Sequence, residues 1–231
     1  MNWLLWREYR LNRLILAAGA VLLLLPYVVA LVAVGALVVM EEPIEGILEG
    51  ALAWSLLSSW IAVLLMASNA IAGERTDRSA EFLAYLPLPR KQLLAAKLLL
   101  SLIAVATMLG FHTLASIICF GPAETVRNVD PRLLTTLISI LLLTYGASWL
   151  MSSLQSSVVV AAVSGFVTTV LVLFCVAYFV GARIEETTEP VDVDEYVLKP
   201  MIMWMIASSL SVAVVCFAIG TWKYLRTTEL R

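Results

Sequence analysis

Residues 158–180 read VVVAAVSGFVTTVLVLFCVAYFV, a run without a single charged side chain. An α-helix rises about 1.5 Å per residue, so roughly 20 apolar residues cross the hydrocarbon core of a bilayer, which is about 30 Å thick. A backbone in lipid has no water to bond, so its amides must be paired within their own segment. The run therefore predicts a membrane-spanning α-helix.

Five more stretches of the chain have similar length and composition. They contain no Asp, Glu, Lys or Arg, and they cover residues 14–40, 51–72, 98–120, 133–154 and 201–222. The sequence thus predicts an all-α, polytopic membrane protein with six transmembrane helices in a single domain, residues 1–231. Pro26 lies near the middle of the first span and predicts a kink there, because proline removes one helical hydrogen bond.

Overall composition supports this fold class. Of the 231 residues 61% are hydrophobic and 14% are charged, and the mean hydropathy is +0.95. A soluble domain has roughly 45–50% apolar and about 25% charged residues. No soluble core of this length could bury so much apolar surface, so the composition excludes a soluble enzyme, a disordered chain and a disulfide-rich secreted domain.

The distribution of Lys and Arg predicts the orientation in the membrane. With six spans both termini lie on one side, and the segments on that side hold eleven of the fifteen Lys and Arg residues. Basic residues accumulate on the cytoplasmic side, so we expect both termini in the cytoplasm and the chain in the cytoplasmic (inner) membrane. Residues 3–13 mix Trp and Tyr with Arg and predict an N-terminal helix at the membrane interface. Trp54, Trp149, Trp204, Trp222 and Tyr178 lie near span ends, as aromatic belts do.

Several kinds of chemistry lack the residues that they need. The spans hold no carboxylate, lysine or arginine to bind a coupling ion, and the chain has no G-x-x-x-x-G-K-[ST] phosphate-binding loop. We therefore expect no catalytic residues, no metal site and no cofactor. His112 is the one histidine, and it serves either a pathway or a contact between helices. Ser116 lies one turn from His112 on the same helix, which is poor geometry for a catalytic dyad.

The connection between the second and third spans is the longest one on the predicted cytoplasmic side. Residues 73–97 read GERTDRSAEFLAYLPLPRKQLLAAK. Residues 77–86 predict a short helix that Pro87 stops, and Pro89 can begin the next helix. Arg90, Lys91 and Lys97 are then expected at the headgroups. From the residues alone, the segment is either a solvated helix that anchors its neighbouring spans or a docking element for a cytoplasmic partner.

This segment resembles the cytoplasmic segment of type-two ABC-transporter permeases, the membrane subunits of exporter-like ATP-binding-cassette systems. The similarity rests on the pattern G-E-R-x-x-R-S-A-E-F-L-x-x-L-P-L-P-R-x-x-L-L-x-x-K, with Ala80 where the family has glycine. The haem-exporter membrane subunit of cytochrome c maturation has a similar L-P-L-P run, so the motif does not separate these relatives. The topology extends the resemblance: six spans, a long inner connection after the second, and a short turn at residues 154–157.

The resemblance implies a permease that works as a dimer, with a second copy or a paralogue, and with ATPase subunits docked on the cytoplasmic side. ATP hydrolysis is then expected on the partner, and neither nucleic acid nor a cofactor is involved. Residues 73–87 would form the coupling helix, with these residues at the ATPase contact: Glu74, Arg78, Glu81, Phe82, Leu83, Leu86 and Pro87. Ser148 and Ser152, with other small residues, would pack helices closely or line a path, and close packing is favoured.

A second hypothesis from another class is a self-sufficient channel, or a membrane scaffold whose inner segment is only an anchor. An intramembrane enzyme is a more distant third. Spans without fixed charge favour a hydrophobic or amphipathic substrate, and the residues do not define it further.

Overall fold

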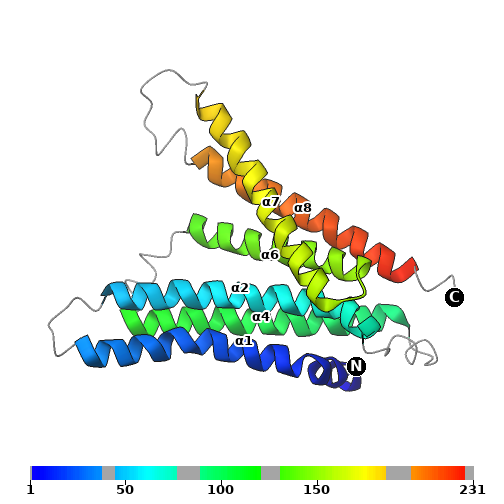
Figure 1. Cartoon of the computed structure of the whole chain (residues 1–231), viewed down its shortest axis with the longest axis horizontal. Coiled ribbons are helices and arrows are strands. Elements are labelled where there is room, and N and C mark those ends of the chain that lie inside the picture. The colour runs from blue at the N-terminus through cyan, green and yellow to red at the C-terminus, as the bar shows by residue number, and fades with distance from the viewer. Residues whose placement is uncertain (1, 38–44, 77–88, 121–130, 186–198, 227–231) are drawn as a thin grey trace. The chain divides into compact units, whose positions relative to one another are not determined.

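The computed structural model of the chain describes residues 2–37, 45–76, 89–120, 131–185 and 199–226. Nearly all of these residues are helical, and the part described contains no strand. The helices are α1 (Asn2–Leu37), α2 (Glu45–Thr76), α4 (Arg90–Phe120), α6 (Pro131–Leu154), α7 (Val158–Glu185) and α8 (Lys199–Arg226), shown in Figure 1. The predicted all-α class is confirmed.

Each of the six helices is long and apolar enough to cross a membrane. Five of the predicted spans fall one within each of α2, α4, α6, α7 and α8, and α6 and α7 meet at the predicted short turn. The first predicted span, residues 14–40, lies in α1 up to Leu37, and its last three residues lie outside the described part of the chain. The second span was predicted to end at Ala72, but α2 continues to Thr76. Hydroxyl and guanidinium groups at this end of α2 bond to α6 and to the turn between α6 and α7, which gives the polar residues of the added turn partners within the protein.

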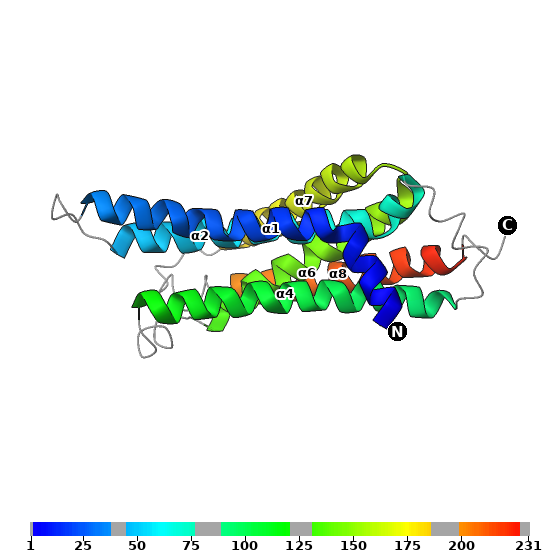
Figure 2. The ribbon, with the colours of Figure 1, turned by 90° about the horizontal axis from the view of Figure 1, so that it is seen from below.

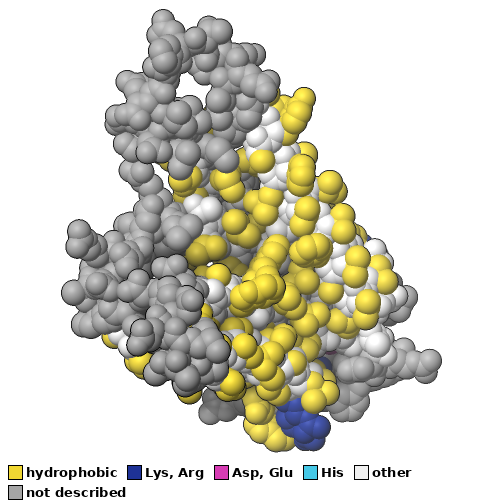
Figure 3. Space-filling view, turned by 60° about the vertical axis from the view of Figure 1, so that its left-hand side comes forward, with side chains coloured by type: hydrophobic (Ala, Val, Ile, Leu, Met, Phe, Trp, Pro, Cys, Tyr) yellow, Lys and Arg dark blue, Asp and Glu magenta, His cyan; other side chains and the backbone are white. Residues whose placement is uncertain are grey.

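Large apolar side chains remain exposed along every one of the six helices. Leu31, Val159 and Phe174 are examples, each with more than two thirds of its surface accessible. Figure 3 shows one face of the molecule on which almost all described side chains are hydrophobic. Such a surface suits lipid and not water. The described chain therefore has the make-up of a multi-pass membrane protein.

The chain divides into two compact units. The first contains residues 1–66 and 85–128, which include α1, most of α2 and α4. Gly19 permits a close approach of α1 to α2, since a Cβ at this position would lie 3.0 Å from the Cβ of Ala62. Helix α1 also packs along α4.

Residues 3–13 were predicted to form an interfacial helix. They are helical and form the first turns of α1, since Asn2–Leu37 is one helix that continues through Pro26. Figure 2 shows its first turns bent away from the remainder. Within these turns the Asn12 side chain donates to the Glu8 carbonyl at 2.9 Å. A side chain that bonds to the carbonyl of residue i−4 competes with the helical ladder and is a known cause of bending.

The second unit contains residues 67–84 and 129–231, with the end of α2 and helices α6, α7 and α8. Helix α6 packs against both α7 and α8. Glycines allow these contacts: a Cβ on Gly146 would lie 2.6 Å from the Ala213 carbonyl oxygen, and one on Gly165 would overlap the Ser148 side chain. Small residues at helix contacts are how membrane helices approach one another.

Trp149 is an exception to the predicted aromatic belt. Its side chain is fully buried in the second unit, where it stacks on Tyr145 at 5.9 Å and contacts Phe217 at 5.4 Å between ring centroids. The belt prediction was wrong for Trp149 because a large aromatic ring also fills the gap that glycines leave between α6 and α8. The other predicted belt residues are exposed: Trp54, Tyr178, Trp204 and Trp222.

Candidate functional site

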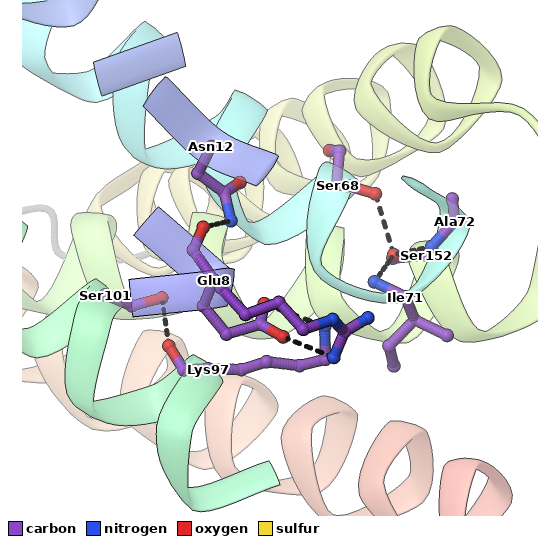
Figure 4. Close-up of polar contacts among 9 residues, drawn as sticks. Glu8, Asn12, Ser68, Ile71, Ala72, Lys97, Ser101 and Ser152 are labelled. Atoms are coloured by element: carbon purple, nitrogen blue, oxygen red, sulfur yellow. Dashed lines mark hydrogen bonds and ion pairs between the residues drawn. The ribbon is translucent and has the colours of Figure 1, made fainter. Parts of the chain in front are cut away.

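Ser152 of α6 bonds directly to the backbone of α2. Its Oγ accepts hydrogen bonds from the amides of Ile71 (3.0 Å) and Ala72 (2.8 Å), and it donates to the Ser68 carbonyl at 2.7 Å (Figure 4). One hydroxyl offers one donor and two acceptor sites, and Ser152 uses all three.

This hydroxyl occupies a particular place in the helix. In a regular α-helix the amide of residue 72 bonds to the carbonyl of residue 68. Ser152 Oγ bonds to both of these groups, so it lies within the helical ladder of α2. Insertion of a side chain into the ladder is one of the identifiable causes of a helix bend. The end of α2 is therefore fixed to α6 through its own main chain.

Arg75 and Thr76 complete this attachment one turn further on. The Arg75 guanidinium donates to the carbonyls of Ser153 (2.9 Å) and Gln155 (3.0 Å). The Thr76 hydroxyl lies 2.9 Å from the Ser156 carbonyl and also 2.9 Å from the Ala72 carbonyl of its own helix, so these two acceptors share its one proton. The last carbonyls of a helix have no intrahelical donor, and a basic group there also suits the helix dipole. The last turn of α2 therefore caps α6 and holds the α6–α7 turn. We call residues 68–76, with their contacts to α6 and to this turn, the α2 anchor.

The α2 anchor, residues 68–76, includes the first four residues of the predicted coupling helix, residues 73–87, and these four belong to α2. Glu74 was predicted at a partner contact; it lies near the end of α2 and is buried within the chain, and its contact with a partner stays a prediction. The remaining predicted contact residues lie outside the part of the chain that the structure describes: Arg78, Glu81, Phe82, Leu83, Leu86 and Pro87. The following helix begins at Arg90, and the Gln92 amide bonds to the Pro89 carbonyl at 2.9 Å, so Pro89 precedes a helix as predicted.

His112 lies at a buried contact of three helices in the first unit. Its Nδ1 is 3.3 Å from the Tyr27 hydroxyl of α1, and its Nε2 is 3.0 Å from the Ser59 hydroxyl of α2. Ser59 Oγ also donates to the Ser55 carbonyl, and Ser55 Oγ donates to the Leu23 carbonyl, both at 2.9 Å. This series of bonds therefore begins at Tyr27 of α1, passes through α4 and α2, and ends at Leu23 of α1.

The number of protons in this series favours one histidine tautomer. Ser59 has one hydroxyl proton, and with that proton on the Ser55 carbonyl, Ser59 accepts from His112 Nε2–H. Nδ1 is then the acceptor, and Tyr27 donates to it. The arrangement satisfies a neutral imidazole at both nitrogens. These contacts join α1, α2 and α4.

A buried ion pair in the first unit was not predicted. Lys97 Nζ of α4 lies 3.1 Å from Glu8 Oε2 of α1, and Arg7 Nη1 lies 3.3 Å from Glu8 Oε1 (Figure 4). Glu8 is 1% exposed and Lys97 is 4% exposed. Lys97 was predicted to face the headgroups, but its side chain is buried in the protein, because a carboxylate on α1 offers it a partner there.

One pattern in the sequence indicates the buried position of Glu8, the acidic partner in this pair. Leu4, Glu8 and Asn12 recur at a spacing of four, so they share one helix face, and all three are buried. The signal was hidden because Trp, Tyr and Arg occupy the other positions and no simple apolar stripe results. The partner, Lys97, lies 89 positions away, and local spacing says nothing about it.

Ser148 and Ser152 were predicted at a pathway or a helix contact. Both are fully buried in the second unit. Ser152 bonds to α2, and Ser148 packs against Gly165 of α7. Within the described residues Ser148 Oγ has no hydrogen-bond partner. The structure thus places both serines where helices meet.

No protein-family model, curated protein or solved structure matches this chain.

Proposed function

We propose that this chain is the permease subunit of an ABC transporter. It would move a hydrophobic or amphipathic substrate across the cytoplasmic membrane as a dimer, with a second copy or a paralogue. A separate cytoplasmic ATPase would supply the energy. The chain itself would not be an enzyme.

The α2 anchor is the observation that carries this proposal. A transport subunit that is driven by a separate ATPase needs a rigid connection between its cytoplasmic segment and its spans. A force on the segment reaches the spans through this connection. Residues 68–76 supply such a point, because Ser152, Arg75 and Thr76 join them to α6 and to the α6–α7 turn by bonds of 2.7–3.0 Å. The resemblance of residues 73–97 to ABC permeases adds the partner that would apply the force.

Chain connectivity gives a second reason. Residues 77–84 follow the α2 anchor in the second unit, and residues 85–128 belong to the first unit. A partner that binds the segment between α2 and α4 would therefore act where the chain passes from one unit to the other. Rigid-body movement of one helix bundle against another is a common form of gating.

The test removes apolar contact area from the segment and leaves the spans untouched. We expect Phe82→Ala with Leu83→Ala to insert and dimerise normally but to lose its ATPase partner. Burial of one such side chain is worth roughly 1.5–3 kcal/mol, so the pair should weaken the complex by at least tens-fold. The protein is purified from its own membranes, and a co-purifying subunit with a phosphate-binding loop is sought by mass spectrometry. ATP-driven transport is measured in vesicles.

A matched control is Leu102→Ala with Ile103→Ala, which trims two exposed apolar side chains on α4. This variant should keep both the partner and transport. If the Phe82 and Leu83 variant also keeps its partner and its transport, the segment between α2 and α4 only holds the neighbouring spans in the membrane. The channel or scaffold hypothesis then replaces the proposal.

A further inference from the structure

The first turns of α1 have two chemically different faces. Leu4, Glu8 and Asn12 are buried, and the ion pair with Lys97 fixes this face against α4. The opposite face carries Trp3, Trp6, Arg7, Arg10 and Arg13, which recur at spacings of three and four. Trp3 and Trp6 are more than half exposed, and Arg10 and Arg13 are exposed as well.

This outer face contains a groove of about 400 Å³. Its lining consists of Trp3, Trp6, Arg7, Arg10, Leu11 and Arg13. The groove therefore combines three guanidinium groups with two indole rings. The Arg10 guanidinium stacks 4.8 Å from the centre of the Trp6 ring, which holds the cation at the groove and leaves its N–H groups available.

The charges in these turns do not balance. Glu8 is the one acidic residue of α1, and its two carboxylate oxygens already face Lys97 and Arg7. No carboxylate of the described residues lies within ion-pair distance of Arg10 or Arg13. Arg10 and Arg13 are therefore two positive charges that no acid of the described residues balances.

The surroundings of the groove match an amphiphile and not a soluble anion. Leu11 lines it, and Leu14 and Val21, one and three turns further along α1, are strongly exposed apolar side chains. Indole rings prefer the level of lipid headgroups, and guanidinium groups bind phosphate oxygens in pairs. An acyl chain could follow α1 while its headgroup occupies the groove.

From this combination we propose that the groove binds the headgroup of an anionic phospholipid of the surrounding leaflet. The arginines contact the phosphate, the tryptophans flank the glycerol region, and the acyl chains lie along the exposed apolar side of α1. This inference is independent of the transport function, because it uses only residues of α1 and α4.

Native mass spectrometry tests the proposal. The purified chain is mixed with equal amounts of phosphatidylglycerol and phosphatidylcholine in detergent, and the retained lipids are counted. We expect the wild type to retain phosphatidylglycerol preferentially. Arg10→Gln with Arg13→Gln should lower this retention roughly thirty-fold, since each cation near the membrane surface is worth about 1 kcal/mol. Both positions are exposed and Arg7, Glu8 and Lys97 are unchanged, so the fold should be preserved; circular dichroism checks this.

The control removes two equally exposed cations elsewhere. Lys91→Gln with Arg226→Gln takes away the same charge, and Arg226 also stacks on a tryptophan, Trp222, at 4.6 Å. This variant should retain phosphatidylglycerol like the wild type. Equal losses in the two variants would show diffuse attraction and overturn the proposal. Displacement of the lipid by millimolar inorganic phosphate would also overturn it, because the groove would then bind the free anion.

Discussion

At the scale of single residues, the first unit contains two polar contacts that join helices by different means. The Glu8–Lys97 pair is ionic, whereas His112 is held by neutral hydrogen bonds from Tyr27 and to Ser59. An ion pair removed from solvent loses hydration on both sides, so its partners depend strongly on each other. A neutral hydrogen bond between membrane helices is worth less, on average about 0.6 kcal/mol.

The ion pair predicts a large asymmetry between single and double substitutions. Lys97→Met should lower the free energy of unfolding by about 3–5 kcal/mol, because it leaves Glu8 charged and buried with Arg7 as its cation. Glu8→Gln combined with Lys97→Met should recover most of the loss. Unfolding is followed in detergent, with Lys91→Met as the exposed control on the same helix. Equal stability of the two lysine variants would contradict the pair.

The histidine contact predicts a tautomer. Nitrogen NMR of labelled protein should show His112 neutral and protonated at Nε2, and Tyr27→Phe should remove the donor to Nδ1 at a cost of about 0.6–1.7 kcal/mol. The comparison variant is Thr113→Ala, since the Thr113 hydroxyl is exposed and bonds only within its own helix, to the Leu109 carbonyl. Protonation at Nδ1 would reverse the assigned direction of every bond in the series.

At the scale of elements, α2 has two different environments. Its first part packs with α1 and α4, and residues 68–76 form the α2 anchor on α6. The positions of the helices could be predicted because apolar length is a property of a continuous segment. The α2 anchor could not be predicted, because Ser152 and the α2 backbone lie about 80 positions apart. The sequence also does not show whether a serine in a span bonds to a neighbouring helix or to its own helix.

Two serines on α6 test the α2 anchor directly. Ser152→Ala removes three hydrogen bonds to the α2 backbone and should lower stability by about 1–3 kcal/mol, because it leaves buried amide and carbonyl groups with fewer partners. Ser148→Ala, one turn earlier and equally buried, should change stability by less than about 0.5 kcal/mol. The two variants are unfolded side by side in detergent. Losses of the same size would mean that helix packing, and not the inserted hydroxyl, accounts for the effect.

At the scale of the whole molecule, the chain passes between its two units three times: inside α2, between α2 and α4, and before α6. Sequence patterns predicted six spans but not this division. Hydropathy predicts which residues are buried in the membrane, whereas the division into two units depends on which spans contact one another. The candidate site could be predicted only in part. A motif indicated residues 73–97, whereas the roles of Glu8, Tyr27 and Ser59 depend on partners on other helices, which the sequence does not show.

The orientation of the whole chain is a further prediction. Eleven of fifteen basic residues lie on the side of the termini, so a cysteine introduced at Glu189 should react with an impermeant reagent added outside, and one at Thr227 should not. The background chain carries alanine in place of Cys119, Cys175 and Cys216. Reaction at Thr227 alone would place both termini outside and would remove the cytoplasmic partner from the proposal.

The α2 anchor also sets an order of events during synthesis. Thr76 leaves the ribosome about 80 residues before Ser156, to which it bonds. Synthesis adds roughly 5–20 residues per second, so about 4–16 s pass between the synthesis of the end of α2 and that of its partners in α6 and the following turn. During this interval α2 must keep its own complete ladder of hydrogen bonds, and the Ser152 hydroxyl enters that ladder only afterwards. The second unit is therefore completed only after α2 has formed, when α6 brings the Ser152 hydroxyl to the α2 backbone.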